Sequence, residues 1–163
     1  MIIENTKKDL SKALFVINDA ALKYKGVIPD YCWHEPYMFE KELISEVDNG
    51  VRMFGYIKNN KLLGVMGIQE LEGVTLIRHA YTLTNYQGKG IGTSLLQYLF
   101  EINESDFLLV GTWREATWAV QFYQKFGFIA QTKKQTHQLL KKYWDIPSKQ
   151  INNSIVLAKN ISN

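Results

Sequence analysis

A glycine-rich segment, Gln87-Gly88-Lys89-Gly90-Ile91-Gly92-Thr93, has the composition of an anion-binding loop. It follows a predicted strand and opens a segment with the apolar periodicity of a helix. Glycines let the backbone approach a ligand closely and adopt positive φ angles. The N–H groups of the first helical turn have no partners inside the helix, and the helix dipole adds positive potential there. The segment therefore predicts a site for a phosphate, with pyrophosphate as the natural occupant.

Two common phosphate-binding motifs do not fit this loop. The P-loop requires Gly-x-x-x-x-Gly-Lys-Ser/Thr, whereas Lys89 lies between glycines. The dinucleotide fingerprint would place a glycine at Thr93, and the acidic residue expected about 20 positions later is also missing. A tight turn that only starts a helix stays an alternative. Three glycines within residues 88–92, with a lysine among them, are more than such a turn requires.

A second dense segment runs from Trp118 to Phe128. Ala119 and Tyr123 are one helical turn apart and share a face. The four-residue spacing of three rings predicts that the core face of this helix carries Trp118, Phe122 and Phe126. Tyr123 falls at the edge of that stripe, so the segment alone leaves open that Tyr123 is one more core aromatic.

Length and composition exclude several protein classes. The chain has 163 residues, of which 46% are hydrophobic and 21% charged, which excludes a disordered, collagen-like or coiled-coil chain. Its 19 basic and 16 acidic residues give a net charge of +3, without the dense basic footprint of a nucleic-acid-binding protein. No stretch approaches the ~20 apolar residues of a membrane span. The N-terminus lacks the features of a signal peptide, so a cytoplasmic protein is expected.

Hydrophobic patterning predicts helices at 7–24 and 39–48, separated by an irregular aromatic segment at 26–38. Strands are predicted at 51–57, 62–69 and 74–83, and their short links require antiparallel neighbours. The remaining predicted elements are a helix after the glycine loop, a strand at 107–112, a helix at 118–126, a strand at 128–132, a helix at 135–145 and a last strand at 151–158. A strand–helix–strand unit within a largely antiparallel sheet indicates an α+β, or mixed α/β, fold.

Taken together, the two segments resemble the GNAT family of acyl-CoA-dependent N-acetyltransferases. Residues 87–92 match the family's acetyl-CoA loop in full, and its second block is matched by Ala119, Phe122-Tyr123 and Gly127-Phe128. The motifs cover about residues 50–130, and the order of elements extends the resemblance over 1–163 as one domain. The passages at 26–29, 33–38 and 143–147 also resemble a bacterial branch of the family. The resemblance implies a three-layer fold, with helices on both faces of a twisted, mostly antiparallel sheet and a splayed parallel strand pair.

The resemblance also implies acetyl-CoA as cosubstrate, held by two backbone segments and one helix. The backbone at the end of the 74–83 strand would pair with the pantetheine arm and polarise the thioester, and the glycine loop would hold the pyrophosphate. The implied cofactor-binding residues are Ala80, Tyr81, Thr82, Gln87, Gly88, Lys89, Gly90, Ile91, Gly92, Thr93 and Ala119. Many members carry an Asn that contacts CoA where this chain has Ala116, so that contact is absent or replaced by Thr117 or Arg114.

Direct acetyl transfer to a primary amine, of a small molecule or a peptide, needs no covalent enzyme intermediate. The amine must lose a proton, the oxyanion needs N–H donors, and the leaving thiolate needs a proton. The resemblance implies that Tyr123 faces the sulfur, and its phenol is predicted to be the general acid.

The general base and the acceptor site are less sharply defined by the sequence. His34, Glu35 and His79 are candidate bases, and a water chain would need no single base. Because side chains alternate along a strand, either Arg78 or His79 should face the acceptor. His79 as a buried structural histidine and Glu35 as an ion-pair or capping residue stay open. The aromatic segment predicts an acceptor wall, or else a loop packed on the core, and the predicted substrate-binding residues are Trp33, His34, Tyr37 and Arg78.

Other chemistries find little support. The histidines lack metal-ligand spacing, so no metal is predicted. Cys32, the one cysteine, has no neighbour that would activate it as a nucleophile. A CoA-binding sensor without catalysis is the main alternative function, and a binder of some other phosphate is a third. The expected partner is an amine acceptor, without nucleic acid or membrane, and a homodimer is expected only by analogy with the family.

Overall fold

A seven-stranded mixed sheet organises the computed structural model, which describes residues 1–162. Within these residues the strand order is β1-β2-β3-β4-β5-β7-β6, and only β4 and β5 run parallel. The strands are β1 Ile2–Glu4, β2 Val51–Lys58, β3 Lys61–Leu71, β4 Val74–Thr82, β5 Phe107–Trp113, β6 Ile129–Ala130 and β7 Ser154–Asn160. The expected mixed α/β architecture is confirmed.

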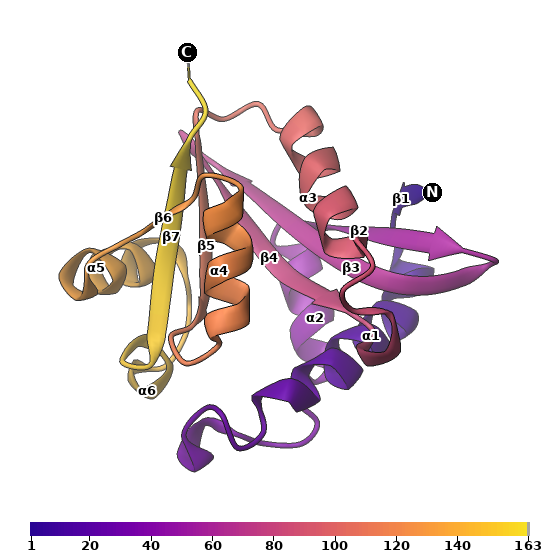
Figure 1. The fold of residues 1–163 in the computed structure, drawn as a ribbon, viewed down its shortest axis with the longest axis horizontal. Helices are drawn as coiled ribbons and strands as arrows, with labels where there is room; N and C mark the ends of the chain where they lie inside the picture. Colours follow the sequence, from indigo (N-terminus) through magenta and orange to yellow (C-terminus); the bar gives the residue numbers. More distant parts are fainter. Residues whose placement is uncertain (163) are drawn as a thin grey trace.

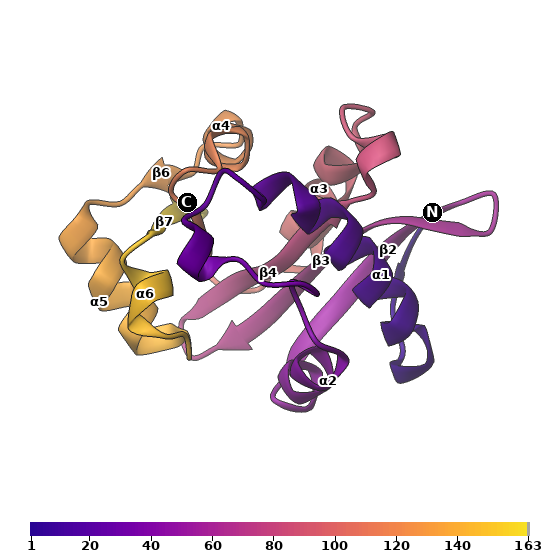
Figure 2. The ribbon, with the colours of Figure 1, turned by 90° about the horizontal axis from the view of Figure 1, so that it is seen from below.

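Helices cover both faces of this sheet. Figure 2 shows α3 and α4 over one face and α2 and α5 over the other. The helices are α1 Leu10–Ala21, α2 Glu40–Asp48, α3 Ile91–Ile102, α4 Thr117–Lys125, α5 Lys133–Tyr143 and α6 Ser148–Ile151. Short 3₁₀ turns are present at Lys7–Asp9, Leu22–Tyr24, Asp30–Cys32 and Thr84–Tyr86. No helix in the described part of the chain combines the length and apolar character that a membrane crossing would need.

Helix ends follow local chemistry. Thr132 begins α5, because its hydroxyl accepts the Gln135 N–H at 3.2 Å while the Gln135 side chain accepts the Thr132 N–H at 3.1 Å. Gly127 ends α4 in the left-handed conformation, at φ 84°, as the sequence predicts.

The parallel strands pair over a short distance and then separate. Thr75–Ile77 of β4 pairs with Leu108–Val110 of β5, and beyond these residues the two strands diverge (Figure 1). On its other edge β4 stays paired with β3 as far as Thr82. Among the described residues, the edge of β4 that faces β5 therefore has no strand partner from Arg78 to Thr82, where only the Thr82 carbonyl has a side-chain partner, Gln87. This confirms the expected splay.

A β-bulge interrupts β4 inside this divergent part. Val65 pairs with Tyr81 and Gly67 with Arg78, so two residues of β4 oppose Met66 alone. His79 lies in this bulge with φ 51°, a left-handed conformation that is uncommon for a residue with a side chain. The bulge breaks the alternation of side chains along β4.

Three predictions need correction. The last strand begins at Ser154 rather than 151, because 148–151 forms α6 and buries Ile151. The 128–132 strand shrinks to the two residues of β6, and β1 was not predicted because three residues show no periodicity. The predicted core face of α4 is incomplete: Trp118, Phe122 and Phe126 are half-buried and pack against the core, but the buried residue of the helix is Tyr123, at 4% exposed. Phe122 and Phe126 also pack on each other, and Phe126 packs on Phe100 of α3.

Candidate functional site

The glycine loop forms a row of unpaired donors at the start of α3. Gly88 and Gly90 have φ angles of 73° and 83°, which an L side chain disfavours, although a Cβ would meet no atom within 4 Å at either position. Among residues 1–162, no acceptor takes the N–H groups of residues 88–93. The Gln87 side chain donates to the Thr82 carbonyl at 3.1 Å and fixes the loop to the end of β4. The loop thus presents its donors beside the open edge of that strand.

A cavity of about 320 Å³ lies between this loop, the end of β4 and α4. It gathers the predicted cofactor-binding residues of β4, the loop and α4, together with Tyr123. Lys89 is the exception, since its ammonium lies over the Tyr86 ring at 5.1 Å and does not line the cavity.

Tyr123 is the buried aromatic of α4 and lines this first cavity. Burial raises the pKa of its phenol well above the ordinary value, and the neighbouring Tyr24 raises it further. The phenol therefore keeps its proton at neutral pH, as a proton donor must.

The position of the family's usual Asn is apolar here. Ala116 is fully buried, and Arg114 donates to the Ser154 carbonyl at 3.0 Å and does not line the first cavity. The wall of the cavity next to Ala119 is formed by Trp118, which stacks on Tyr24 and lies under the Lys23 ammonium at 4.4 Å.

A second cavity, of about 360 Å³, lies between α2, the diverging strands β4 and β5, and the segment that leads into α6. Of the residues predicted on the acceptor side, His34, Tyr37, Arg78 and His79 line it. Sequence reasoning missed much of this wall, including Glu46 of α2, Trp113 of β5, and Trp144 and Asp145 after α5. These residues come from distant parts of the chain, and no local pattern marks them.

Glu35 and Trp33 do not line this cavity. The Glu35 carboxylate is exposed and pairs with Lys25 at 2.9 Å, which is the ion pair that the sequence left open. The hydrogen bond and charge of Lys25 lower the pKa of Glu35. Trp33 stacks on Tyr37, which lines the cavity, with ring centroids 5.9 Å apart.

Tyr24 and Tyr81 line both cavities and mark where they meet. Their rings make an edge contact at 6.3 Å, and Tyr37 approaches Tyr24 at 5.4 Å. The Trp113 indole N–H donates to the Tyr37 hydroxyl at 2.7 Å. Burial raises the pKa of all three phenols, so this junction is uncharged.

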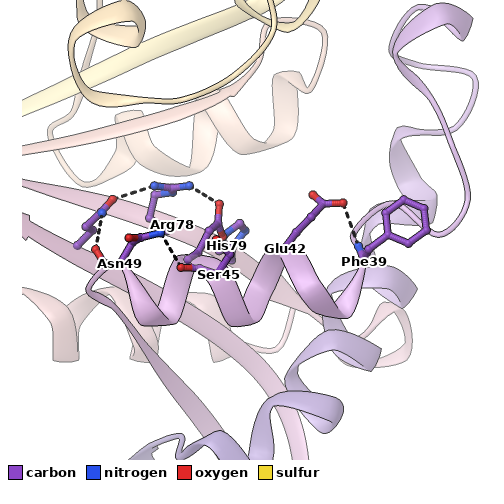
Figure 3. A network of polar contacts seen from close by, with 8 residues as sticks. Phe39, Glu42, Ser45, Asn49, Arg78 and His79 are labelled. Atoms are coloured by element: carbon purple, nitrogen blue, oxygen red, sulfur yellow. Dashed lines mark hydrogen bonds and ion pairs between the residues drawn. The ribbon is translucent and has the colours of Figure 1, made fainter.

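Glu46 joins Arg78 and His79 on the floor of the second cavity, and Figure 3 shows both side chains directed at α2. Arg78 Nη2 donates to Glu46 Oε1 at 2.5 Å, and His79 Nε2 bonds Glu46 Oε2. The expectation that only one of the two residues faces the acceptor is wrong, because the bulge places both on one face. Burial raises the pKa of Glu46, but the hydrogen bonds and charges of His79 and Arg78 outweigh it, and the pKa lies below its ordinary value.

The structure does not favour chemistry by Cys32 or by a bound metal ion. Burial raises the pKa of the Cys32 thiol, the opposite of what an activated nucleophile needs. In the part of the chain that the structure describes, no three His, Cys, Asp or Glu side chains gather as metal ligands.

Solved structures share this fold. PaiA N-acetyltransferase from Thermoplasma acidophilum, in complex with coenzyme A, is 16% identical, with a TM-score of 0.71 and 98% of each chain covered. An acetyltransferase of the GNAT family from Staphylococcus aureus is 17% identical, with a TM-score of 0.72 and 99% of each chain covered. The ribosomal-protein-S18-alanine N-acetyltransferase from Escherichia coli is 18% identical, with a TM-score of 0.70, and the match covers 100% of this chain and 94% of that one.

Sequence comparison gives the family. A search of curated protein sequences found no match. The family model described as "Acetyltransferase (GNAT) domain" matches residues 49–130, half of the chain, and spans β2 to β6 with the glycine loop and α4. The chain belongs to the GNAT family of acetyltransferases.

Proposed function

We propose that this chain, as one domain over 1–163, transfers the acetyl group of acetyl-CoA directly to a primary amine of a small molecule or peptide. The observation that carries the proposal is the pair of cavities on opposite sides of the β4–β5 divergence, which meet at Tyr24 and Tyr81. Two substrates entering from the two sides would react at this junction without a covalent enzyme intermediate.

The first cavity fits coenzyme A. The unpaired N–H groups of residues 88–93 and the dipole of α3 would hold the pyrophosphate. The open edge of β4 at Ala80–Thr82 would pair with the amides of the pantetheine arm. When bound, acetyl-CoA supplies an activated acetyl thioester. The coenzyme A complex of the Thermoplasma relative supports this assignment.

Proton transfer would involve one residue from each cavity. Tyr123 would donate a proton to the leaving thiolate, since its phenol is protonated and lines the first cavity. His79 would accept the proton of the amine, since it lines the second cavity two residues before Tyr81. His34 also lines the second cavity, but its side chain is exposed, whereas that of His79 is 14% exposed.

The test combines binding and turnover. Calorimetric titration should show binding of acetyl-CoA but not of NAD or ATP, and binding should stabilise the fold by about 2.7 kcal/mol at 100 times Kd. Thiol release is then followed with a panel of small amines and short peptides. Binding with transfer supports the proposal. Binding without transfer to any amine indicates a CoA-binding sensor, and the absence of binding refutes the cofactor assignment.

A further inference from the structure

We infer that Glu46 is a positioning residue, which holds the imidazole of His79 so that Nδ1, and not Nε2, accepts the proton of the acceptor amine. The inference rests on the proposed function, because it assigns a mechanism to the proposed base. Sequence reasoning assigned Glu46 no role.

The contact that carries the inference joins two elements. Glu46 projects from α2 and His79 lies in the bulge of β4, and the carboxylate bonds His79 with one oxygen and Arg78 with the other. The side chain of Glu46 is 26% exposed and those of Arg78 and His79 are 14% exposed, so water competes little for these bonds. The orientation of the carboxylate is thus fixed from two sides.

Further hydrogen bonds hold Arg78 in place. Its Nη1 donates to Gln69 Oε1 at 2.9 Å, and the Gln69 amide donates to the Asn49 carbonyl at 3.2 Å. Asn49 follows α2 and donates back to the Ser45 carbonyl at 2.8 Å (Figure 3). The network therefore ties the end of α2 to β3 and β4, and Glu46 stays aligned with the bulge.

The ionised carboxylate selects one tautomer of His79. A carboxylate with a pKa below its ordinary value is ionised at neutral pH and can only accept hydrogen bonds. Nε2 of His79 must then carry the proton, and in the neutral ring Nδ1 carries the lone pair. No group among residues 1–162 bonds Nδ1, so that nitrogen is available to a substrate.

The backbone is consistent with a positioning role. A histidine at φ 51° occupies a conformation that persists only where its surroundings enforce it. This conformation turns His79 onto the face of Arg78, where it meets Glu46. Without the bulge, the two side chains would point to opposite faces of the sheet.

The direct test is the tautomer of His79, measured by long-range ¹H–¹⁵N NMR on ¹⁵N-histidine-labelled protein. The chain has 3 histidines, and a His79→Gln sample identifies the resonance. At a pH where the ring is neutral, wild-type His79 should carry its proton on Nε2. Glu46→Ala should show a mixture of tautomers, and Glu46→Gln should weaken the preference. Glu40→Ala is the matched control, because Glu40 lies on the same helix but lines neither cavity.

Turnover provides the second readout. With an amine from the panel, kcat of Glu46→Ala should fall roughly 10- to 100-fold. Its Kd for acetyl-CoA should change less than about twofold, because Glu46 does not line the first cavity. Unchanged Nε2–H tautomer in Glu46→Ala, or unchanged kcat, overturns the inference. If wild type binds no acetyl-CoA or transfers to no amine, the proposed function fails instead, whatever the tautomer.

Discussion

The indole of Trp113 on β5 donates a hydrogen bond to the hydroxyl of Tyr37 at 2.7 Å and thereby joins the sheet to the loop before α2. Tyr37 is half-buried, and Trp113 is 5% exposed. The bond fixes one side of the aromatic junction between the two cavities.

Removing this bond should lower stability and leave a measurable coupling. Tyr37→Phe and Trp113→Phe should each reduce the free energy of unfolding by about 1–2 kcal/mol, because each leaves a polar group without its partner. A double-mutant cycle from urea denaturation should give a coupling of about 0.5–1.5 kcal/mol. Strictly additive effects would mean that the bond does not form in solution.

Tyr123→Phe should separate catalysis from binding. We expect kcat with an amine to fall about 100-fold, because the thiolate loses its proton donor. The Kd for acetyl-CoA should change less than about twofold, since the ring and its packing remain. Tyr98→Phe is the control, as the Tyr98 ring packs on Phe54 and lines neither cavity. Equal activity of the two variants would remove Tyr123 from the mechanism.

Gly90→Ala should weaken both the fold and the binding of acetyl-CoA. A residue with a Cβ at φ 83° costs about 1–2 kcal/mol, and relief of that strain would turn the loop donors away from the pyrophosphate. The comparison is Gly73→Ala, at φ 77° in the turn between β3 and β4. Both variants should lose similar stability in urea, but only Gly90→Ala should raise the Kd, by about tenfold. A similar Kd for both would show that the loop does not hold the cosubstrate.

The Glu46 network should make stability depend on pH. The folded-state pKa of Glu46 lies below its ordinary value of 4.5, so its stabilisation is present above 4.5 and is lost as the pH falls through the folded-state pKa. Glu46→Gln should cost about 1–3 kcal/mol at pH 7, because Arg78 and His79 lose a charged partner. The difference from wild type should shrink in urea titrations below pH 4. A difference that stays constant over that range would contradict the low pKa.

Much of the fold could be predicted from local patterns in the sequence. Short turns such as 58–61 and 70–73 required antiparallel strands, and apolar spacing marked α1 and α3. Most residues that line the first cavity could be predicted in the same way, because those of the glycine loop and those of α4 are each close together in the sequence. Tyr123 was identified through its motif, although the predicted core face placed it at the edge of the buried stripe.

Much of the lining of the second cavity could not be predicted in this way. Glu46 and Trp113 reach it only through tertiary packing, and their neighbours in the sequence give no sign of it. The bulge at His79 depends on how β3 and β4 align, which strand alternation does not reveal. Glu35 lies beside predicted site residues in the sequence, yet its side chain is 52% exposed and pairs with Lys25.

The early end of the β4–β5 ladder has a consequence for motion. Amides of Ala80–Thr82 that face the gap lack a strand partner, so a ligand that bonds them would act as an extra strand. Hydrogen–deuterium exchange at these amides should slow when acetyl-CoA binds, while exchange at Thr75–Ile77, already paired with β5, should change little. The cosubstrate would then complete the sheet and stiffen the strand on which the acceptor must be aligned.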